Sequence, residues 1–238
     1  MELAHILAAL TGIGLALFAI TSSKLATGLL VCLFACNLFL VLSTARHVQL
    51  VGARRRFRRS EQASRDQRIN PYEYYLFVLG SGGHTKEMLM MMDDGYCSFQ
   101  NFHRRYLISS GDAMSTNHVV DYETELEALC ATQALMNPPA NTIGARMRYP
   151  TCIFTNGPAT GFFVGLAAHL LKLLYVVPET SMHIVYIESW ARITTLSLTG
   201  KLFYYTGIAD VLVQHKEVAE KYKVQYCGEI VFNARREI

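Results

Sequence analysis

The chain has 238 residues, of which 51% are hydrophobic and 17% charged, and its formal net charge at pH 7 is +3. This length and apolar content suit one globular domain together with a membrane segment. The six cysteines are scattered without the spacing of a zinc site or of a disulfide framework, which disfavours both classes and fits a cytosolic protein face. We expect neither a metal nor a cofactor.

The first 44 residues form an apolar region with only two charges, Glu2 and Lys24. Two uncharged runs of 18 residues, 3–20 and 25–42, are each just long enough for a spanning helix. A secretory signal is disfavoured because no basic segment precedes the first run and no clear cleavage site follows it. We therefore predict a transmembrane anchor of one or two helices over residues 1–44.

A basic segment follows the apolar region. Between Arg46 and Arg68 there are eight arginines against Glu61 and Asp66, a net charge of +6. Such a segment holds its flank on the cytoplasmic side of a membrane and attracts anionic headgroups. The apolar region before it argues against a nucleic-acid partner. We predict that residues 45–71 are a basic cytosolic linker and that the rest of the chain faces the cytosol.

From residue 72 onward, strand and helix patterns alternate along the chain. This alternation, with apolar strands, predicts an α/β domain with a Rossmann-like parallel sheet over residues 72–238. The expected strands are 73–79, 105–109, 152–155, 183–187, 211–214 and a short 224–227, and the expected helices are 86–92, 114–136, 159–174, 199–208 and 216–222.

The first expected strand ends in a glycine-rich turn. The turn reads Gly80-Ser81-Gly82-Gly83-His84-Thr85. A strand, a glycine turn and a helix start can hold a phosphate, because the backbone turns tightly and the helix dipole favours an anion. The turn is not a Walker loop, and it is an imperfect dinucleotide motif because Thr85 replaces the third glycine. A glycine turn without a ligand stays an alternative.

His84 is the candidate catalytic residue of this turn. At a helix N-terminus, a neutral histidine can donate a hydrogen bond to an oxyanion or act as a base. The alternative is a histidine that only caps or packs against the helix.

Ligands of parallel sheets bind at the carboxyl ends of the strands, so polar residues after the other strands are further candidates. Asn156, Gly157 and Pro158 follow the third strand, or form a plain turn before a helix. Glu188 could orient a sugar hydroxyl or be a solvated acid, and Arg192 could pair with a phosphate or with an acid. The helix over residues 161–174 is apolar nearly all round, so it belongs either to the core or to a surface that touches a bilayer.

Several blocks of the sequence carry a resemblance to one family. The blocks are VLGSGGHT (78–85), SGDAMS (110–115), TNGPATG (155–161), VYIESWARITTLSLTGKLFYY (185–205) and VQHKE with GEIV (213–217 and 228–231). Through these blocks the chain resembles the membrane-anchored subunit of the dolichol-linked UDP-N-acetylglucosamine transferase of N-glycosylation. The resemblance implies the N-terminal, acceptor-side half of a split GT-B glycosyltransferase at the endoplasmic reticulum membrane. It also implies a soluble catalytic partner that binds UDP-GlcNAc, and GlcNAc-diphosphodolichol as acceptor.

The resemblance also implies roles for single residues. The first glycine loop would meet the acceptor diphosphate, and the terminal segment that starts at Gly228 and ends at Ile238 would help to hold the partner. One departure stands out, because the family has a longer stretch where this chain has residues 116–154. The implied site comprises Gly80, Ser81, Gly82 and Gly83 for the diphosphate, His84, and an acceptor-side rim of Asn156, Gly157, Pro158, Glu188, Ser189 and Arg192.

Two functions of other classes stay open on the sequence alone. The first is a membrane-tethered nucleotide-dependent oxidoreductase, in which Asp112 would bind a ribose. The second is a pure membrane tether that recruits a partner and contacts no ligand.

Overall fold

The structure is a computed structural model, and it describes residues 9–14, 16, 24–63, 74–92, 103–133, 147–157 and 159–228. The chain divides into two compact units, Met1–Arg65 and Asp66–Ile238. Each unit is described by itself.

The first unit is dominated by one long helix, α2 (Lys24–Ala63). Within the described residues, its part from Thr27 to Arg56 is the one helix that is long and apolar enough to cross a membrane. The helix continues without a break through the arginines, which are good helix formers, and no proline interrupts it. Most of the first apolar run, 3–20, and residues 64–71 of the expected linker lie outside the described residues.

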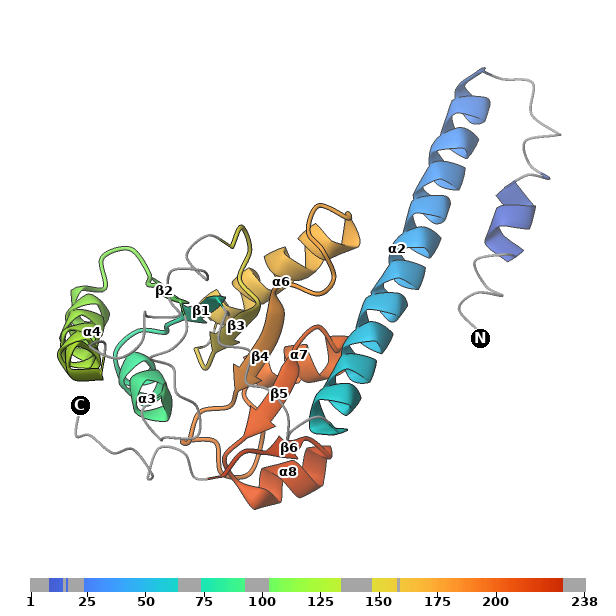
Figure 1. Cartoon of the computed structure of the whole chain (residues 1–238). Helices are drawn as coiled ribbons and strands as arrows, with labels where there is room; N and C mark the ends of the chain where they lie inside the picture. Colours follow the sequence, from blue (N-terminus) through green and yellow to red (C-terminus); the bar gives the residue numbers. More distant parts are fainter. Residues whose placement is uncertain are drawn as a thin grey trace. The chain divides into compact units, whose positions relative to one another are not determined.

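The second unit is a six-stranded parallel sheet with helices on its faces, which confirms the predicted α/β class (Figure 1). The strand order is β2-β1-β3-β4-β5-β6. The strands are β1 (Tyr74–Val78), β2 (His103–Leu107), β3 (Cys152–Thr155), β4 (His183–Ile187), β5 (Asp210–Val213) and β6 (Gln225–Tyr226), and the helices are α3 (Gly83–Met92), α4 (Ala113–Gln133), α6 (Ala159–Leu173), α7 (Leu198–Thr206) and α8 (Lys216–Tyr222).

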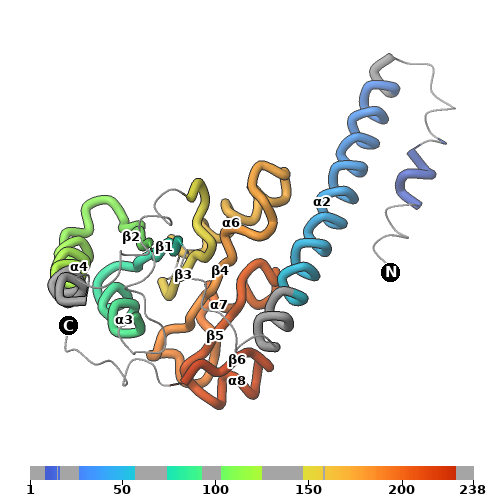
Figure 2. The backbone as a smooth tube through the Cα atoms, in the orientation of Figure 1, coloured from blue at the N-terminus to red at the C-terminus, as the bar shows by residue number. Residues whose placement is uncertain are grey.

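Strand β1 lies inside the sheet and sends alternate side chains to two cores. Phe77 belongs to a cluster with Leu89 of α3 and Tyr122 of α4. Its neighbour Val78 belongs to a second cluster that includes Phe203 of α7. Successive side chains of a strand point to opposite faces, so these clusters lie on the two faces of the sheet. Figure 2 shows the chain passing from the α3 and α4 side to the α6 and α7 side.

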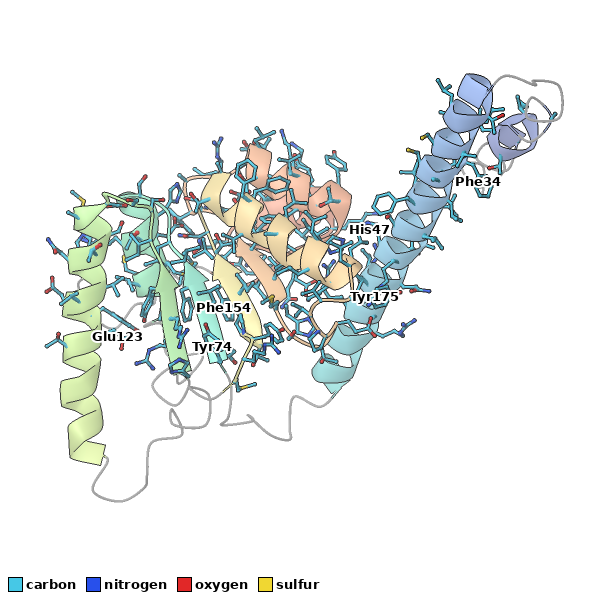
Figure 3. The ribbon with its side chains drawn as sticks, turned by 90° about the horizontal axis from the view of Figure 1, so that it is seen from above. Phe34, His47, Tyr74, Glu123, Phe154 and Tyr175 are labelled. Carbon is cyan, nitrogen blue, oxygen red and sulfur yellow. The ribbon has the colours of Figure 1, made fainter. Side chains whose placement is uncertain are left out.

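Helix α4, on which Figure 3 labels Glu123, is fixed against the edge strand β2 by a partly buried ion pair. The Arg104 guanidinium donates two hydrogen bonds to the Glu123 carboxylate, at 2.9 and 2.8 Å, and the Tyr106 hydroxyl donates a third. Between β2 and β3 the described residues hold this one helix and no strand, while residues 134–146 lie outside the description.

Candidate functional site

The glycine turn joins β1 to α3 at the carboxyl edge of the sheet. Helix α3 begins at Gly83, three residues before its predicted start, so His84 lies in its first turn. Gly82 has a φ of +57°, a left-handed conformation that glycine adopts at little cost, and its carbonyl accepts the amides of Thr85 and Lys86. Within the described part of the chain, the amides of Gly82 and Gly83 donate to no protein acceptor. This arrangement offers N–H donors at a helix N-terminus to an anion.

The buried hydroxyl groups of Thr85 and Ser115 connect the glycine turn to the start of α4. The Thr85 hydroxyl donates to the Gly80 carbonyl and lies 2.7 Å from the Ser115 hydroxyl at the start of α4. Ser115 in turn donates its hydroxyl and its amide to the two oxygens of Asp112, at 2.6 and 3.0 Å. These hydrogen bonds lower the pKa of Asp112 and hold its carboxylate as the cap of α4. Asp112 is thereby engaged within its own loop.

The loop after β3 meets the glycine turn backbone to backbone. A Cβ atom on Gly157 would lie 3.0 Å from the Gly80 Cα, which is closer than Cβ contacts normally come, so this approach needs glycine. The adjacent Asn156 is buried and donates its side-chain amide to the His84 carbonyl at 2.8 Å. Pro158 lies outside the described residues.

Glu87 of α3, which the sequence analysis did not select, joins four segments of the site. Its Oε1 accepts the backbone amide of Trp190 at 2.6 Å and the side-chain amide of Gln214 at 3.2 Å. Its Oε2 lies 3.4 Å from Asn156 Nδ2 and 3.5 Å from His84 Nδ1. Burial alone would raise the pKa of Glu87, but the nearby His84 side chain and the hydrogen bond from the Trp190 amide outweigh it and lower the pKa.

Glu188 points into the protein rather than toward the glycine turn. Its buried carboxylate accepts the amide of Ser197 at 2.8 Å, the Ser197 hydroxyl at 3.1 Å and the Tyr186 hydroxyl at 3.1 Å. Ser197 caps α7, so Glu188 anchors that helix N-terminus. The period of two along β4 predicts this direction, since Glu188 follows Tyr186 on the side that α7 covers.

The N-terminal part of α3 and the loop after β4 line an open pocket of about 480 Å³. The pocket brings together three predicted residues, Gly83, His84 and Ser189. Ser81 is exposed on the turn, Gly80, Asn156 and Gly157 are buried beneath it, and Arg192 is exposed on the loop after β4. The pocket is lined by Gly83, His84, Lys86, Glu87, Met90, Ser189, Trp190 and Ala191.

Sequence reasoning missed the cation and the indole of this pocket. Lys86 is exposed one residue past the predicted turn. Trp190 packs on His215, with 4.2 Å between the ring centroids, and its carbonyl lies 2.7 Å from His215 Nε2. Trp190 belongs to the block 185–205 that carries the family resemblance, and Lys86 directly follows the block 78–85. Across the described ranges, no group of three or more His, Cys, Asp or Glu side chains could hold a metal ion.

The sequence matches a family model described as "Oligosaccharide biosynthesis protein Alg14 like", over residues 75–137 and 128–230. The chain belongs to this family. The matched residues include the glycine turn, the pocket and all six strands apart from the first residue of β1. The resemblance inferred from the sequence blocks is therefore confirmed.

Curated relatives of this Alg14-like chain carry the name UDP-N-acetylglucosamine transferase subunit. The relative from Yarrowia lipolytica is 32% identical over 84% of this chain and 98% of its own length. The relatives from Saccharomyces cerevisiae and Homo sapiens are 27% and 29% identical, over 79% and 66% of this chain and 94% and 82% of their own lengths. No solved structure matches the chain significantly. The names disfavour the oxidoreductase alternative. The Asp112 carboxylate, which would bind a ribose in that alternative, instead accepts a hydrogen bond from Ser115.

Proposed function

We propose that this chain is the membrane-anchored, acceptor-side subunit of an enzyme that transfers GlcNAc from UDP-GlcNAc to GlcNAc-diphosphodolichol. Membership of a family whose relatives are named as subunits of a UDP-N-acetylglucosamine transferase carries this proposal. The word subunit implies a complex, and the partner we propose is a soluble catalytic chain that binds the donor. The long apolar helix α2 supports membrane anchoring. As part of the proposal we assign the domain to the cytosolic face of the endoplasmic reticulum, because arginines follow the apolar run.

In this proposal the glycine turn binds the diphosphate of the lipid acceptor. The amides of Gly82 and Gly83 and the N-terminus of α3 favour an anion, and Lys86 adds a positive charge beside the same pocket. His84 lines the pocket and either donates to the reacting groups or accepts a proton from the acceptor hydroxyl. The loop from Ser189 to Arg192 is the side of the pocket that we assign to the acceptor sugar.

Reconstitution of the purified full chain in vesicles that contain GlcNAc-diphosphodolichol tests the division of labour. We expect no transfer from UDP-GlcNAc by this chain alone, and transfer once the soluble partner is added. Transfer by the single chain would refute the split enzyme. Removal of the last ten residues should abolish co-purification of the partner, and retained co-purification would refute only that docking segment.

Protease protection in sealed microsomes tests the orientation. Protease added from outside should digest the domain from residue 74 onward, because the arginines after the apolar run hold that side in the cytosol. Complete protection of the domain would contradict the cytosolic assignment.

The kinetics of His84→Ala separate two roles of the histidine. If His84 acts in the transition state, turnover should fall by roughly 100-fold or more with little change in acceptor affinity. If it binds only the ground-state phosphate, the loss should appear mainly as a higher acceptor KM. Normal kinetics in this variant and in variants of the glycine turn would favour the pure tether instead.

A further inference from the structure

Helix α6 turns polar side chains toward the protein interior and large apolar side chains toward the surface, which is the reverse of an ordinary surface helix. Its buried residues are Gly161, Gly165, Ala168, His169 and Lys172. Its exposed residues include Phe163, Leu170 and Leu171, and the exposed Leu174 follows directly after its last residue. In a domain surrounded by water, lysine and histidine would lie outside and phenylalanine and leucine inside.

Close packing fixes this orientation. A Cβ atom on Gly161 would lie 2.2 Å from the Thr155 hydroxyl, and one on Gly165 would lie 2.9 Å from the Phe203 ring. The inner face of α6 therefore has no room for Phe163 or the leucines. Inside the domain, the Lys172 ammonium donates to the Met182 carbonyl at 2.9 Å. The helix cannot rotate to bury its leucines without breaking these contacts.

The neighbouring helix α7 extends the apolar surface. The two helices lie side by side (Figure 3), and Phe162 of α6 packs on Phe203 of α7 with ring centroids 5.4 Å apart. Leu198, Leu202 and Tyr205 are exposed on α7 at positions i, i+4 and i+7, which is one stripe. We define the apolar face as Phe163 (66% exposed), Leu170, Leu174 (59%), Leu198 (75%), Leu202 and Tyr205 (76%).

The two segments that carry the apolar face contain cations and no acids. Residues 159–178 and 189–209, which include both helices, contain no aspartate or glutamate. Arg192 and Lys201 lie in the second of these segments. Segments with exposed apolar residues, tyrosines and cations but no acids suit the boundary between anionic headgroups and acyl chains.

The anchor limits how far the domain can move from a bilayer. Helix α2 carries the candidate membrane span and ends at Ala63, and ten residues separate it from Tyr74, the first residue of the sheet. These residues can extend over at most about 40 Å, so the domain remains close to the end of the anchor. Helix α6 itself, with 15 residues, would be only about 22 Å long and cannot cross a hydrocarbon core of about 30 Å.

We infer that the apolar face of α6 and α7 lies on the lipid bilayer in which α2 is anchored, parallel to its surface. The two helices begin directly after the loops that carry Gly157 and Ser197, so docking would bring the site edge of the sheet to the membrane. This inference does not depend on the transferase activity.

Site-specific photocrosslinking of the full chain tests the inference. Benzoylphenylalanine is placed at Phe163, Leu174 or Leu198, and the protein is reconstituted in vesicles of phosphatidylcholine and phosphatidylinositol. Leu38 in α2 serves as a positive control, and Val120 on α4, which is 57% exposed, is a matched apolar control. Circular dichroism confirms that each variant is folded.

After illumination, mass spectrometry of the protein identifies lipid adducts. We expect lipid adducts at the three positions of the apolar face at several times the yield found at Val120. Adducts to a second copy of the chain in place of lipid would assign the face to self-association and overturn the inference. Yields at the three positions no higher than at Val120, with normal yield at Leu38, would overturn it as well. Vesicles without phosphatidylinositol should lower the yield at the apolar face and leave Leu38 unchanged.

Discussion

Nδ1 of His84 lies 3.5 Å from Oε2 of Glu87, one helical turn further along α3. The second oxygen of Glu87 accepts the Trp190 amide, so one carboxylate both orients the histidine ring and fixes the loop after β4. A negative charge beside Nδ1 favours the tautomer with the proton on that nitrogen, which leaves Nε2 as the acceptor. Glu87 is therefore a positioning residue for His84.

Replacement of this carboxylate should change the stability of the domain in a pH-dependent way. Glu87→Gln should lower the free energy of unfolding by about 1 to 3 kcal/mol near neutral pH, since charged acceptors form the stronger hydrogen bonds. The pKa of Glu87 lies below its ordinary value of 4.5 in the folded protein. Its contribution is thus present above pH 4.5 and is lost as the pH falls through the folded pKa.

Thermal unfolding in detergent between pH 7 and pH 3.5 measures this difference. At the lower end of that range, about one pH unit below the ordinary value, the carboxylate of the unfolded chain is largely protonated. The gap between the wild type and Glu87→Gln should narrow as the solution is acidified. Glu220→Gln, which removes an exposed carboxylate of α8, is the matched control and should leave stability nearly unchanged. A gap that stays constant with pH would contradict the assigned role of the charge.

Gly83→Ala should separate binding from folding. A Cβ atom at Gly83 meets no atom within 4 Å, and alanine favours helices over glycine by up to about 1 kcal/mol. The variant should be as stable as the wild type or more stable. The added methyl group lies at the proposed diphosphate site, so acceptor kcat/KM should fall at least about tenfold.

The same substitution at Gly52 in α2, where a Cβ atom also has open space, is the control and should retain activity. Full activity of Gly83→Ala would remove the diphosphate assignment of the turn. Gly82→Ala is a less specific test because the φ of +57° at this residue adds backbone strain of about 1 kcal/mol.

Gly157→Ala should give the opposite pattern from Gly83→Ala. Its Cβ atom would lie 3.0 Å from Gly80 Cα and 3.1 Å from Gly80 N, and backbone atoms cannot move aside as a flexible side chain can. We expect a loss of about 1 to 3 kcal/mol in the free energy of unfolding. Chemical denaturation of Gly157→Ala and Gly83→Ala measures this difference in the free energy of unfolding. Equal stabilities would show that the glycine turn and the loop after β3 can move apart at no cost.

Glu188→Gln tests whether this residue contacts a sugar or supports α7. Because its carboxylate accepts bonds from Tyr186 and Ser197, we expect a loss of about 2 kcal/mol in stability and an unchanged acceptor KM below the melting temperature. Ser197→Ala should cost about 1 kcal/mol through the lost cap. The double variant should lose less free energy of unfolding than the sum of the two single losses, because the two residues share one hydrogen-bond network. A raised KM without a change in stability would restore the sugar contact.

The fold was largely predictable because its signals are local. Apolar strand runs alternate with helical patterns, the glycine turn marks the end of the first strand, and the bounds of β3, β4 and α8 agree with those expected. The start of α3 was placed too late because glycines at 82 and 83 suggest a loop, although Gly82 forms the turn and the helix follows at once.

The pocket was less predictable because its contacts are tertiary. Glu87 meets Trp190 and Gln214, which are 103 and 127 residues away in the sequence. No spacing along one helix reveals such a residue. The direction of Glu188, in contrast, was available from the alternation along β4.

The strand order has a consequence for the synthesis of the chain. Tyr74 at the start of β1 donates to Thr151, which lies 77 residues later, just before β3. At about 5 to 20 residues per second, the ribosome needs roughly 4 to 15 s after Tyr74 to synthesise the chain up to β3, the second strand that pairs with β1. During that interval one side of β1 is an unpaired strand edge, which is prone to aggregation. The nascent domain should therefore depend on chaperones at this stage more than a domain in which each strand pairs with the next strand along the chain.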